Sequence, residues 1–511
     1  MSTPADGTVA APAPSAVDAA APGNASDATV GERPVWLVIG PEPLTASLEP
    51  LVRRRKAQGF EVAVLPMEPA AAVAAAPRPP AFVLLVGDDP GDGDDEAGEP
   101  WVVRSPRREL YRWQSDQAER FASDALLGDL DGDLVPDVPV GRIPSRTPEE
   151  AAAVVAKIAA WEDRPPSVAD LRLVAWGGSP DYGPAIDRIV SRAALALVGT
   201  STPPWASLWL LLADREHPLS GDPTRQPEVF GRALRDGGFA TLMIGHSWTD
   251  AFFALELGLT EIWFDTADVR RYLSEGTAGP PAFLITCLAG DFTGAEASLA
   301  EALLSAPAGP VAVVAATTVS HPLPNYFSAL ALVQAFGKPH ERLGELWLAA
   351  QRASLDLRNA LVEWQLEEAE GSLEPELDTA KLRRDQLLLY GILGDPATRL
   401  LLPRPLEARV ERVADGWRWQ VTRPPGALRL EVGLRAANPV AALGALPKPE
   451  DFDAAARALE AANGSLSFEP VTSLGAAVSW GGFVDRPGVL RLVAVTPSGL
   501  HATVVVLADA P

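Results

Sequence analysis

Residues 283–292 read FLITCLAGDF. The stretch begins with an apolar run that contains Cys287 and is closed by Gly290. Short apolar runs closed by glycine are typical of strands buried on both faces of a parallel sheet. The same pattern recurs in LRLVAWGG (171–178), FATLMIGHS (239–247) and GPVAVVAATT (309–318), and helical segments such as 227–238 (PEVFGRALRDGG) alternate with these runs. We therefore predict a doubly wound, mostly parallel α/β sheet with helices on both faces.

The region before residue 166 carries the same kind of pattern. Apolar runs at 35–40 (VWLVIG), 61–66 (EVAVLP) and 81–89 (AFVLLVGDD) predict three more buried strands. A helix is predicted to begin at Thr147, because Thr147 and Glu150 form a capping box with a proline between them. The N-terminal region therefore belongs to the same α/β class.

The pattern changes after residue 403, where short alternating runs such as ALRLEVGLRA (427–436) are separated by turn residues. This alternation predicts an all-β, Ig-like sandwich with one helix inserted near residues 451–462. The predicted organisation is then a disordered Ala/Pro-rich tail over 1–33, an N-terminal α/β subdomain over 34–165, a second α/β subdomain over 166–403 and the sandwich over 404–511.

Composition narrows the possible partners and compartments. The 511 residues carry a formal net charge of -24 at pH 7, which disfavours nucleic acid and anionic membrane surfaces as partners. A single cysteine rules out an internal disulfide. The N-terminus lacks the basic and apolar regions of a signal peptide, and no apolar run approaches the roughly 18 residues of a spanning helix. We expect a cytoplasmic protein, and its oligomeric state stays open.

Two of the predicted strands end in residues with catalytic chemistry, His246 in MIGHS and Cys287 in ITCLAG. Ligands of doubly wound sheets bind at the carboxyl ends of the strands, which is where both side chains fall. A caspase-like cysteine hydrolase needs an exposed thiol, an imidazole that exchanges protons and backbone N–H groups that receive an oxyanion. The alternative is a buried structural cysteine beside a surface histidine.

Five segments, in this order along the chain, together carry a family pattern: AFVLLVGDD (81–89), SDALLGDLDGDLVPDVPVGRIPSRTPEEA (123–151), IGHS (244–247), TCLAGDF (286–292) and LGDPATRL (393–400). On these segments the sequence resembles the gingipain-like (C25-type) cysteine peptidases, a caspase-related family. The resemblance implies a caspase-like fold with residues 166–403 as the catalytic subdomain. It implies Cys287 as nucleophile, His246 as general acid/base and the N–H groups of Ser247 and Cys287 as the oxyanion hole. The substrate would be a protein or peptide, and no cofactor would do chemistry.

The chain departs from the family pattern at two positions near the histidine. Ser247 stands where members usually carry glycine, and Trp176 stands where an acidic residue assists the histidine. An orienting carboxylate would then come from another residue, for which we consider Asp250 or Asp181. A substrate pocket is expected from Trp176, from Asp187 as a selector of basic side chains, and from His321, which follows a strand end.

The segment GDLDGDLVPD (128–137) contains a cluster of four aspartates. Its four carboxylates are hard oxygen ligands of the kind that Ca²⁺ prefers. Leu134 stands where an EF-hand requires glycine, so the loop does not fit that template. We expect a structural Ca²⁺ site here, with a solvated acidic turn as the alternative. The four candidate ligands are Asp129, Asp131, Asp133 and Asp137.

The sequence thus leads to two hypotheses from different classes. The first is a cysteine endopeptidase that hydrolyses peptide bonds through a Cys287–His246 dyad and a thioester acyl-enzyme. The second is a catalytically weak or inactive relative that serves as a protein-binding scaffold. The substitutions Ser247 and Trp176 favour the second hypothesis, and the retained thiol and imidazole favour the first.

Overall fold

The fold is described from a computed structural model of the chain. It describes residues 33–92, 98–111, 120–181, 191–192, 194–195, 198–360, 378–437, 439–440, 443, 448 and 450–508. The predicted N-terminal tail lies almost entirely outside these residues, and so does Asp187.

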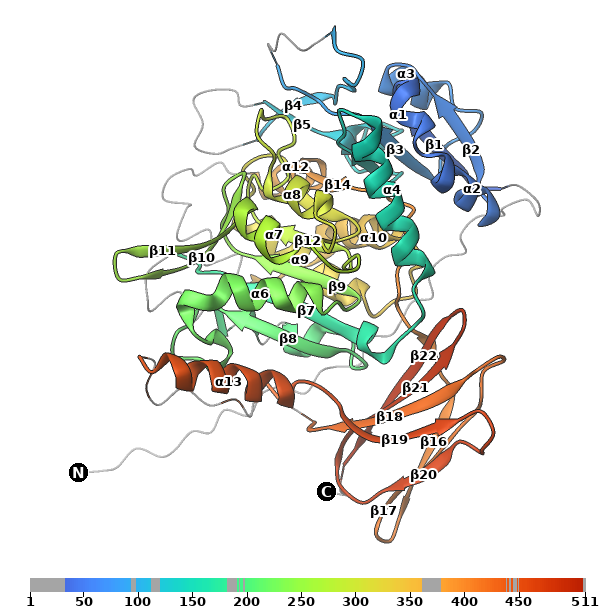
Figure 1. Ribbon diagram of the computed structural model, residues 1–511, viewed down its shortest axis with the longest axis vertical. Helices are drawn as coiled ribbons and strands as arrows, with labels where there is room; N and C mark the ends of the chain where they lie inside the picture. Colours follow the sequence, from blue (N-terminus) through green and yellow to red (C-terminus); the bar gives the residue numbers. More distant parts are fainter. Residues whose placement is uncertain are drawn as a thin grey trace.

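A ten-stranded sheet forms the centre of the molecule (Figure 1). It consists of two blocks of five parallel strands, which meet antiparallel between β13 and β14. Strands from both sides of residue 165 belong to this one sheet, and β14 joins the block of the N-terminal strands. In spatial order the strands are β2 (Glu61–Leu65), β1 (Val35–Ile39), β3 (Phe82–Val86), β6 (Val140–Ile143), β14 (Tyr390–Leu393), β13 (Val313–Ala316), β12 (Ala282–Ile285), β9 (Ala240–Ile244), β7 (Arg172–Gly177) and β8 (Ser207–Leu212).

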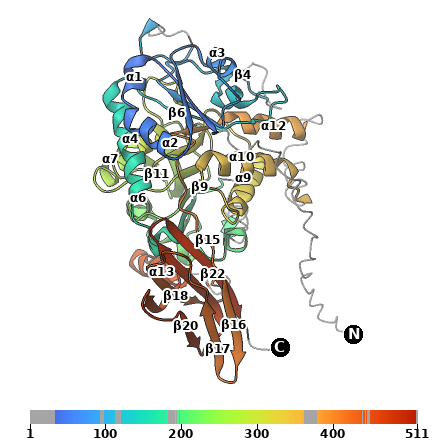
Figure 2. The ribbon, with the colours of Figure 1, turned by 90° about the vertical axis from the view of Figure 1, so that its right-hand side faces the viewer.

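Helices cover both faces of this sheet, as the sequence predicted (Figure 2). The predicted capping box at Thr147 is confirmed at the start of α4. One layer contains α1 (Glu42–Ala46), α2 (Glu49–Ala57), α4 (Pro148–Asp163), α6 (Gln226–Arg235), α7 (Thr266–Tyr272) and α8 (Leu299–Ser305). The other contains α9 (Pro322–Ala335), α10 (Leu343–Asp356) and α12 (Thr379–Leu389), and the short α3 (Pro69–Ala74) contacts β1.

Buried ion pairs hold the N-terminal block together. Asp395, in the loop after β14, accepts hydrogen bonds from Arg55 at 2.6 and 2.9 Å and from the Trp36 indole at 3.1 Å. Arg55 also pairs with Glu162 at 2.9 Å, and all three charged side chains are fully buried. Removing one partner of such a pair leaves an uncompensated buried charge. The LGDPATRL segment therefore has a structural role in joining the end of the α/β region to α2 and β1 near its start.

Two β-hairpins were not predicted from the sequence. The strands β10 (Ala251–Leu257) and β11 (Thr260–Asp265) form an antiparallel hairpin directly after the histidine loop, and Figure 1 shows it projecting from the sheet. Phe253 and Trp263 stack on each other across this hairpin. A smaller hairpin, β4 (Arg107–Glu109) with β5 (Arg120–Ala122), flanks the N-terminal block.

The C-terminal region is all-β except for one helix, as predicted. Two sheets share an apolar core that includes Trp417, Trp419 and Leu492. The inserted helix α13 (Phe452–Ser465) leaves this core and lies along β8, where the Asn463 amide bonds both the N–H and the C=O of Leu210 at 2.7 and 3.1 Å. The strands are β15 (Arg404–Pro405), β16 (Ala408–Val413), β17 (Gly416–Val421), β18 (Arg429–Arg435), β19 (Glu469–Gly475), β20 (Gly481–Val484), β21 (Gly488–Thr496) and β22 (Gly499–Leu507).

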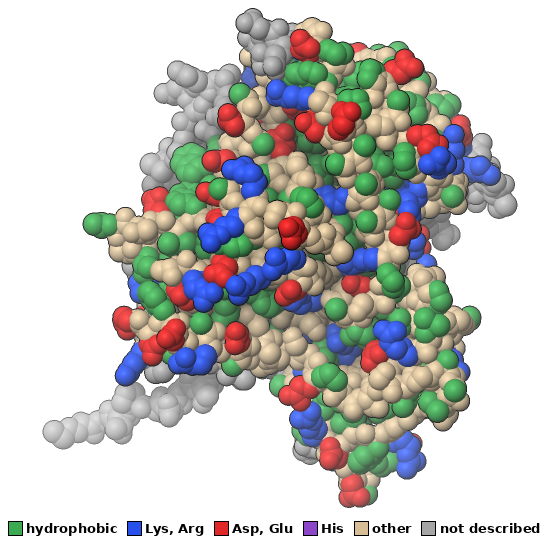
Figure 3. Space-filling view, viewed as in Figure 1, with side chains coloured by type: hydrophobic (Ala, Val, Ile, Leu, Met, Phe, Trp, Pro, Cys, Tyr) green, Lys and Arg blue, Asp and Glu red, His purple; other side chains and the backbone are tan. Residues whose placement is uncertain are grey.

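Charge is mixed on the face shown in Figure 3, where acidic and basic side chains alternate without a large patch of one sign. Among the described residues, no helix combines the length and apolar character needed to cross a bilayer.

Candidate active site

Cys287 stands two residues beyond β12, at the carboxyl end of the strand, and its thiol is half-buried. Three atoms of Ser320, in the loop after the neighbouring strand β13, surround the sulfur. The Ser320 N–H donates to Sγ at 3.4 Å, and the Ser320 carbonyl and hydroxyl oxygens lie 3.4 and 3.5 Å from it. A thiolate at this position would therefore keep at least one N–H donor in contact with its charge.

A chain of buried amides and hydroxyls fixes Ser320. The Asn325 amide donates to the Ser320 hydroxyl at 2.8 Å, and the Asn325 carbonyl oxygen accepts from the Gln386 amide and from the Tyr390 hydroxyl. Burial, with a smaller contribution from nearby Cys287, raises the pKa of Tyr390, so its phenol stays neutral and remains a donor. Because each member is hydrogen-bonded, the network restricts where the Ser320 backbone can lie beside the thiol.

The residue after Cys287 has an unusual backbone. Leu288 takes a φ of 56°, a left-handed conformation that a non-glycine residue rarely adopts. Its N–H donates to the Thr318 carbonyl at 3.0 Å, which ties this turn to the end of β13. The turn carries the chain away from β12 immediately after Cys287 and leaves the thiol at the tip of the strand.

His246 follows β9, the other neighbour of β12, and its side chain is exposed. Its Nε2 lies 2.9 Å from the Pro180 carbonyl oxygen. Since a carbonyl oxygen only accepts, this contact places the proton of a neutral imidazole on Nε2 and the lone pair on Nδ1. Neither Asp181 nor Asp250, the two carboxylates considered as orienting groups, is hydrogen-bonded to the imidazole. The hydrogen-bond partner of the ring is the Pro180 carbonyl oxygen.

Hydrogen bonds join the histidine loop to the cysteine loop. The Ser247 hydroxyl donates to the Cys287 carbonyl oxygen. The first turn of α8 donates to both loops, from Leu299 N–H to Thr249 at 2.7 Å and from Ala300 N–H to Ala289 at 2.9 Å. Within the described residues no hydrogen bond links the imidazole to the thiol directly. The Ser247 hydroxyl and the backbone N–H groups of α8 therefore hold the two loops together, whereas the imidazole and the thiol are not hydrogen-bonded to each other.

Two backbone donors at the junction of these loops are available. In the part of the chain that the structure describes, neither the Ser247 N–H nor the Cys287 N–H donates a hydrogen bond. The neighbours of Ser247 are engaged, since Trp248 N–H bonds Ala251 at 2.8 Å and Phe253 N–H bonds the His246 carbonyl at 2.9 Å. Free N–H groups on adjacent loops beside a thiol have the composition of an oxyanion-binding site.

Trp176 was predicted to line a substrate pocket, and this prediction is wrong. Its side chain is 0% exposed and lies in an aromatic cluster with Phe230, Phe252 and Phe264, with ring centroids 4.5 to 6.0 Å apart. Apolar packing keeps the indole beneath the surface, so it cannot touch a substrate. Because tryptophan occupies position 176, β7 itself offers no carboxylate to the histidine loop.

The family model for peptidase family C25 matches residues 30–401, which include every element described above except the C-terminal β region. The chain belongs to peptidase family C25. Its class is therefore that of a cysteine peptidase, a hydrolase.

Solved structures agree with this C25 fold. The chain is similar to the crystal structure of the Arg-specific cysteine proteinase gingipain R (RgpB), with 14% identity, a TM-score of 0.53, and coverage of 93% of this chain and 98% of that one. It is also similar to the complex of Porphyromonas gingivalis RgpB pro- and mature domains, with 14% identity, a TM-score of 0.52, and coverage of 93% of this chain and 100% of that one. No curated protein matches the sequence.

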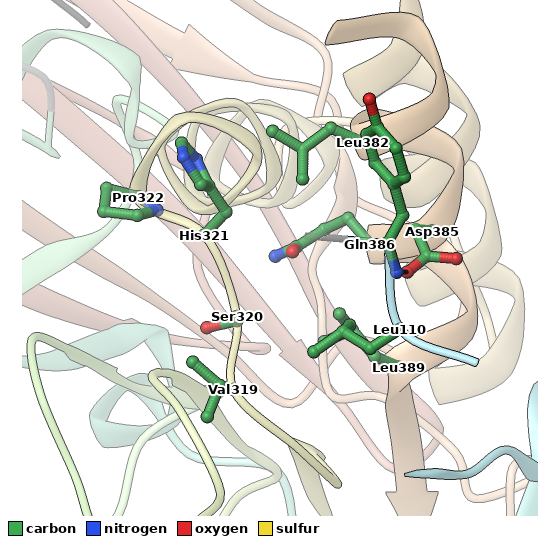
Figure 4. A pocket seen from close by; sticks show the side chains of 10 residues that line it. Leu110, Val319, Ser320, His321, Pro322, Leu382, Asp385, Gln386 and Leu389 are labelled. Carbon is green, nitrogen blue, oxygen red and sulfur yellow. Dashed lines mark hydrogen bonds between the residues drawn. The ribbon is translucent and has the colours of Figure 1, made fainter. Parts of the chain in front are cut away.

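Ser320, which contacts the thiol, also lines a cavity of about 180 Å³ in this C25 peptidase, and we call it the thiol-side cavity (Figure 4). In Figure 4, Leu382, Leu389 and Leu110 face Val319 and Ser320 across it. His321 lines the same space, so one residue of the predicted substrate pocket does reach a cavity. Asp187, predicted to select basic side chains, lies outside the described residues.

Sequence reasoning missed Ser320 and the side chains that hold it. A signal was present, because Ser320 follows the strand next to that of Cys287, and carboxyl ends of neighbouring parallel strands converge. Asn325, Gln386 and Tyr390 carried no such signal, since they come from α9, α12 and β14, and β14 runs antiparallel to β13.

The acidic loop brings three of its four predicted ligands together. Carboxylate oxygens of Asp129, Asp131 and Asp137 lie within 4.8 Å of one another. Asp133 is outside this group, and its carboxylate accepts the Val135 N–H at 2.8 Å.

Proposed function

We propose that the chain is a cysteine endopeptidase that cleaves peptide bonds with Cys287 as nucleophile and His246 as general acid and base. The observation that carries this proposal is the convergence of the two loops. The single thiol of the chain stands at the tip of β12, and the free N–H groups of Ser247 and Cys287 lie on loops that are hydrogen-bonded to each other. Family membership supplies the reaction class.

The reaction would proceed by acyl transfer. The Cys287 sulfur, having given its proton to His246, attacks the peptide carbonyl carbon, and the N–H groups of Ser247 and Cys287 receive the resulting oxyanion. His246 returns the proton to the leaving amine as the C–N bond breaks and a thioester forms. Water then adds to the thioester, gives one proton to His246 and releases the carboxylic acid and the thiol.

Pro180 would take part in orienting the base. Its carbonyl oxygen, 2.9 Å from Nε2, stabilises the tautomer whose Nδ1 accepts the thiol proton. A carbonyl dipole stabilises an imidazolium less than a full carboxylate does. We therefore expect turnover below that of a complete Cys–His–acid triad.

Turnover of internally quenched peptides tests this function. Wild-type protein should cleave members of a mixed-sequence pool, and Cys287→Ala should lower the rate by about 10³-fold or more, since removal of a nucleophile abolishes the covalent route. His246→Ala is the second variant, and Ser305→Ala, which changes an exposed residue of α8, is the matched control that should keep full activity. Equal cleavage by wild type and Cys287→Ala would contradict the proposal.

The second candidate is a scaffold without catalysis. It is favoured by one observation, the apolar cluster around Trp176 where a carboxylate would assist the histidine. A wild-type protein that folds and binds peptides but cleaves none of the pool would support this alternative.

We also propose that Asp129, Asp131 and Asp137 bind a structural Ca²⁺. Three carboxylates within 4.8 Å repel one another unless a cation offsets their charge, and all offer the hard oxygens that Ca²⁺ takes. Leu134 adopts a left-handed φ of 69° at the position where an EF-hand uses glycine, so the backbone makes that turn without the glycine. Calcium should raise the melting temperature, and Asp131→Asn should remove the rise. An unchanged melting temperature with calcium and with chelator would contradict the site.

At the level of architecture, we infer a caspase-like α/β region followed by an Ig-like sandwich. The five parallel strands from β13 to β8, with His246 and Cys287 on adjacent strand ends, support the first assignment. The two sheets around one core support the second.

A further inference from the structure

We propose that the thiol-side cavity binds one apolar side chain of the peptide substrate, of the size of Leu, Met or Phe, next to the scissile bond. The enzyme would then select for an apolar residue at one substrate position. This inference rests on the proposed function and names the substrate class of the same site.

The position of the cavity is the first argument. Ser320 lines it, and the same residue donates its N–H to Cys287 Sγ at 3.4 Å. Ser320 therefore links the cavity to the sulfur, and we expect a substrate side chain next to the scissile bond to reach the cavity. The cavity also lies on the β13 side of Cys287, opposite the β9 side that carries His246, so a side chain in it does not displace the imidazole.

The chemistry of the wall is the second argument. Leu110, Val319, Leu382 and Leu389 line the cavity, and they come from three separate parts of the chain. Leu382 and Leu389 lie on α12, where Leu382 is 5% exposed. Transfer of an apolar side chain from water to such a wall is favourable in proportion to the area buried.

The polar groups of the cavity are already occupied. Asp385 accepts from the Arg108 guanidinium at 2.9 Å on one oxygen and from the Tyr111 N–H at 2.9 Å on the other. The Gln386 side chain reaches across the cavity in Figure 4, and its amide donates to Asn325. A basic substrate side chain would have to compete with Arg108 for a carboxylate that is already paired, whereas an apolar side chain displaces no hydrogen bond.

The size of the cavity is the third argument. Its volume of about 180 Å³ is below the roughly 300–1,000 Å³ of pockets for drug-sized ligands. A single side chain is therefore a fitting occupant, and a cofactor is too large. Filling the cavity with Leu rather than Ala should raise kcat/KM by about 10- to 100-fold, in line with the discrimination that apolar pockets achieve.

The test is a set of internally quenched peptides in which each position within three residues of the cleaved bond carries Leu, Phe, Ala, Lys or Asp. At one position we expect Leu and Phe to be cleaved about 10- to 100-fold faster than Ala, Lys and Asp. Leu382→Ala, which enlarges the cavity, should shift the preference from Leu toward Phe by about tenfold. Leu387→Ala is the matched control, since Leu387 lies on the same helix in the core and does not line the cavity.

Two additions separate failure of this inference from failure of the proposed function. Val319→Thr changes a half-buried wall residue almost isosterically and should lower the Leu-to-Ala ratio in a folded protein. Binding of the same peptides to Cys287→Ala by fluorescence anisotropy reports preference without turnover. Cleavage with no apolar preference, with a Lys preference, or with a preference that both wall variants leave unchanged overturns the cavity but leaves the function standing. No cleavage, together with apolar-selective binding that depends on Leu382, overturns the function but supports the cavity.

Discussion

The thiol and the imidazole stand at the ends of neighbouring strands, but their surroundings differ. Cys287 contacts three atoms of Ser320, and a buried network through Asn325 holds that residue in place. His246 is exposed, and its ring has one hydrogen bond, to the Pro180 carbonyl. The comparison teaches that the thiol side is preorganised by side chains from several elements, whereas the imidazole is held by one backbone carbonyl, from the loop after β7.

The largest expected effect is a loss of stability on the histidine side, when an acid is introduced at the position where a triad carboxylate would stand. Trp176→Asp should destabilise the protein by about 4 kcal/mol or more, because it removes a buried indole and leaves a carboxylate without a partner in an aromatic cluster. Denaturant unfolding monitored by fluorescence measures this, with Trp176→Phe as the milder control. A stable Trp176→Asp protein with raised turnover would show that the two sides differ less than we infer.

A pH-dependent loss of stability of intermediate size is expected at α8, the helix whose first turn is hydrogen-bonded to both loops. Burial raises the pKa of Glu301, in the first turn of α8, to about 7 from its ordinary value of 4.5. The folded state then binds a proton more tightly than the unfolded state. The stability that this provides is fully present below about pH 4.5 and is lost as pH rises through 7, a difference of about 3 kcal/mol.

Glu301→Gln tests this account, because the amide keeps an oxygen that accepts from Ser298 N–H but cannot ionise. We expect its free energy of unfolding to vary less than that of the wild type between pH 4.5 and 8. Urea unfolding at several pH values measures the difference. Parallel curves for the two proteins would remove Glu301 as the source of the pH dependence.

A smaller effect is expected on the reactivity of the Cys287 thiol. Ser320→Ala keeps the backbone N–H but removes the hydroxyl 3.5 Å from Sγ, so we expect the rate of Cys287 alkylation at pH 7 to fall by about tenfold. The single cysteine makes the measurement clean, because every alkylation reports on one site. Ser354→Ala, at a buried serine of α10, is the control. An unchanged rate would mean that the network positions only the backbone.

The sequence predicts the positions of the thiol and the imidazole better than it predicts the side chains around them. The positions of Cys287 and His246 at strand ends followed from local apolar runs that end in glycine, because a buried parallel strand is encoded locally. The orientation of Trp176 was not encoded in the same way. Whether a side chain near the end of a strand reaches the surface depends on what packs over it, here α6 and the unpredicted hairpin β10–β11.

The support of Ser320 depends on contacts distant in sequence. Gln386 and Tyr390 reach Asn325 across 61 and 65 residues, and they do so only because β14 returns antiparallel beside β13. Alternating strands and helices predict a parallel sheet, so this reversal in direction was not foreseen. The acidic loop is the opposite case, since its carboxylates are close in sequence and three of them meet in space.

The central claim is that Cys287 is a nucleophile in a preorganised site, and the most direct measurement is intact-mass analysis after treatment with a peptidyl acyloxymethyl ketone. We predict that the folded wild type gains one inhibitor mass, that peptide mapping places it on Cys287, and that His246→Ala reacts far more slowly. Denatured wild type should remain unlabelled while still reacting with iodoacetamide. A folded wild type that iodoacetamide modifies but the ketone does not would contradict the claim.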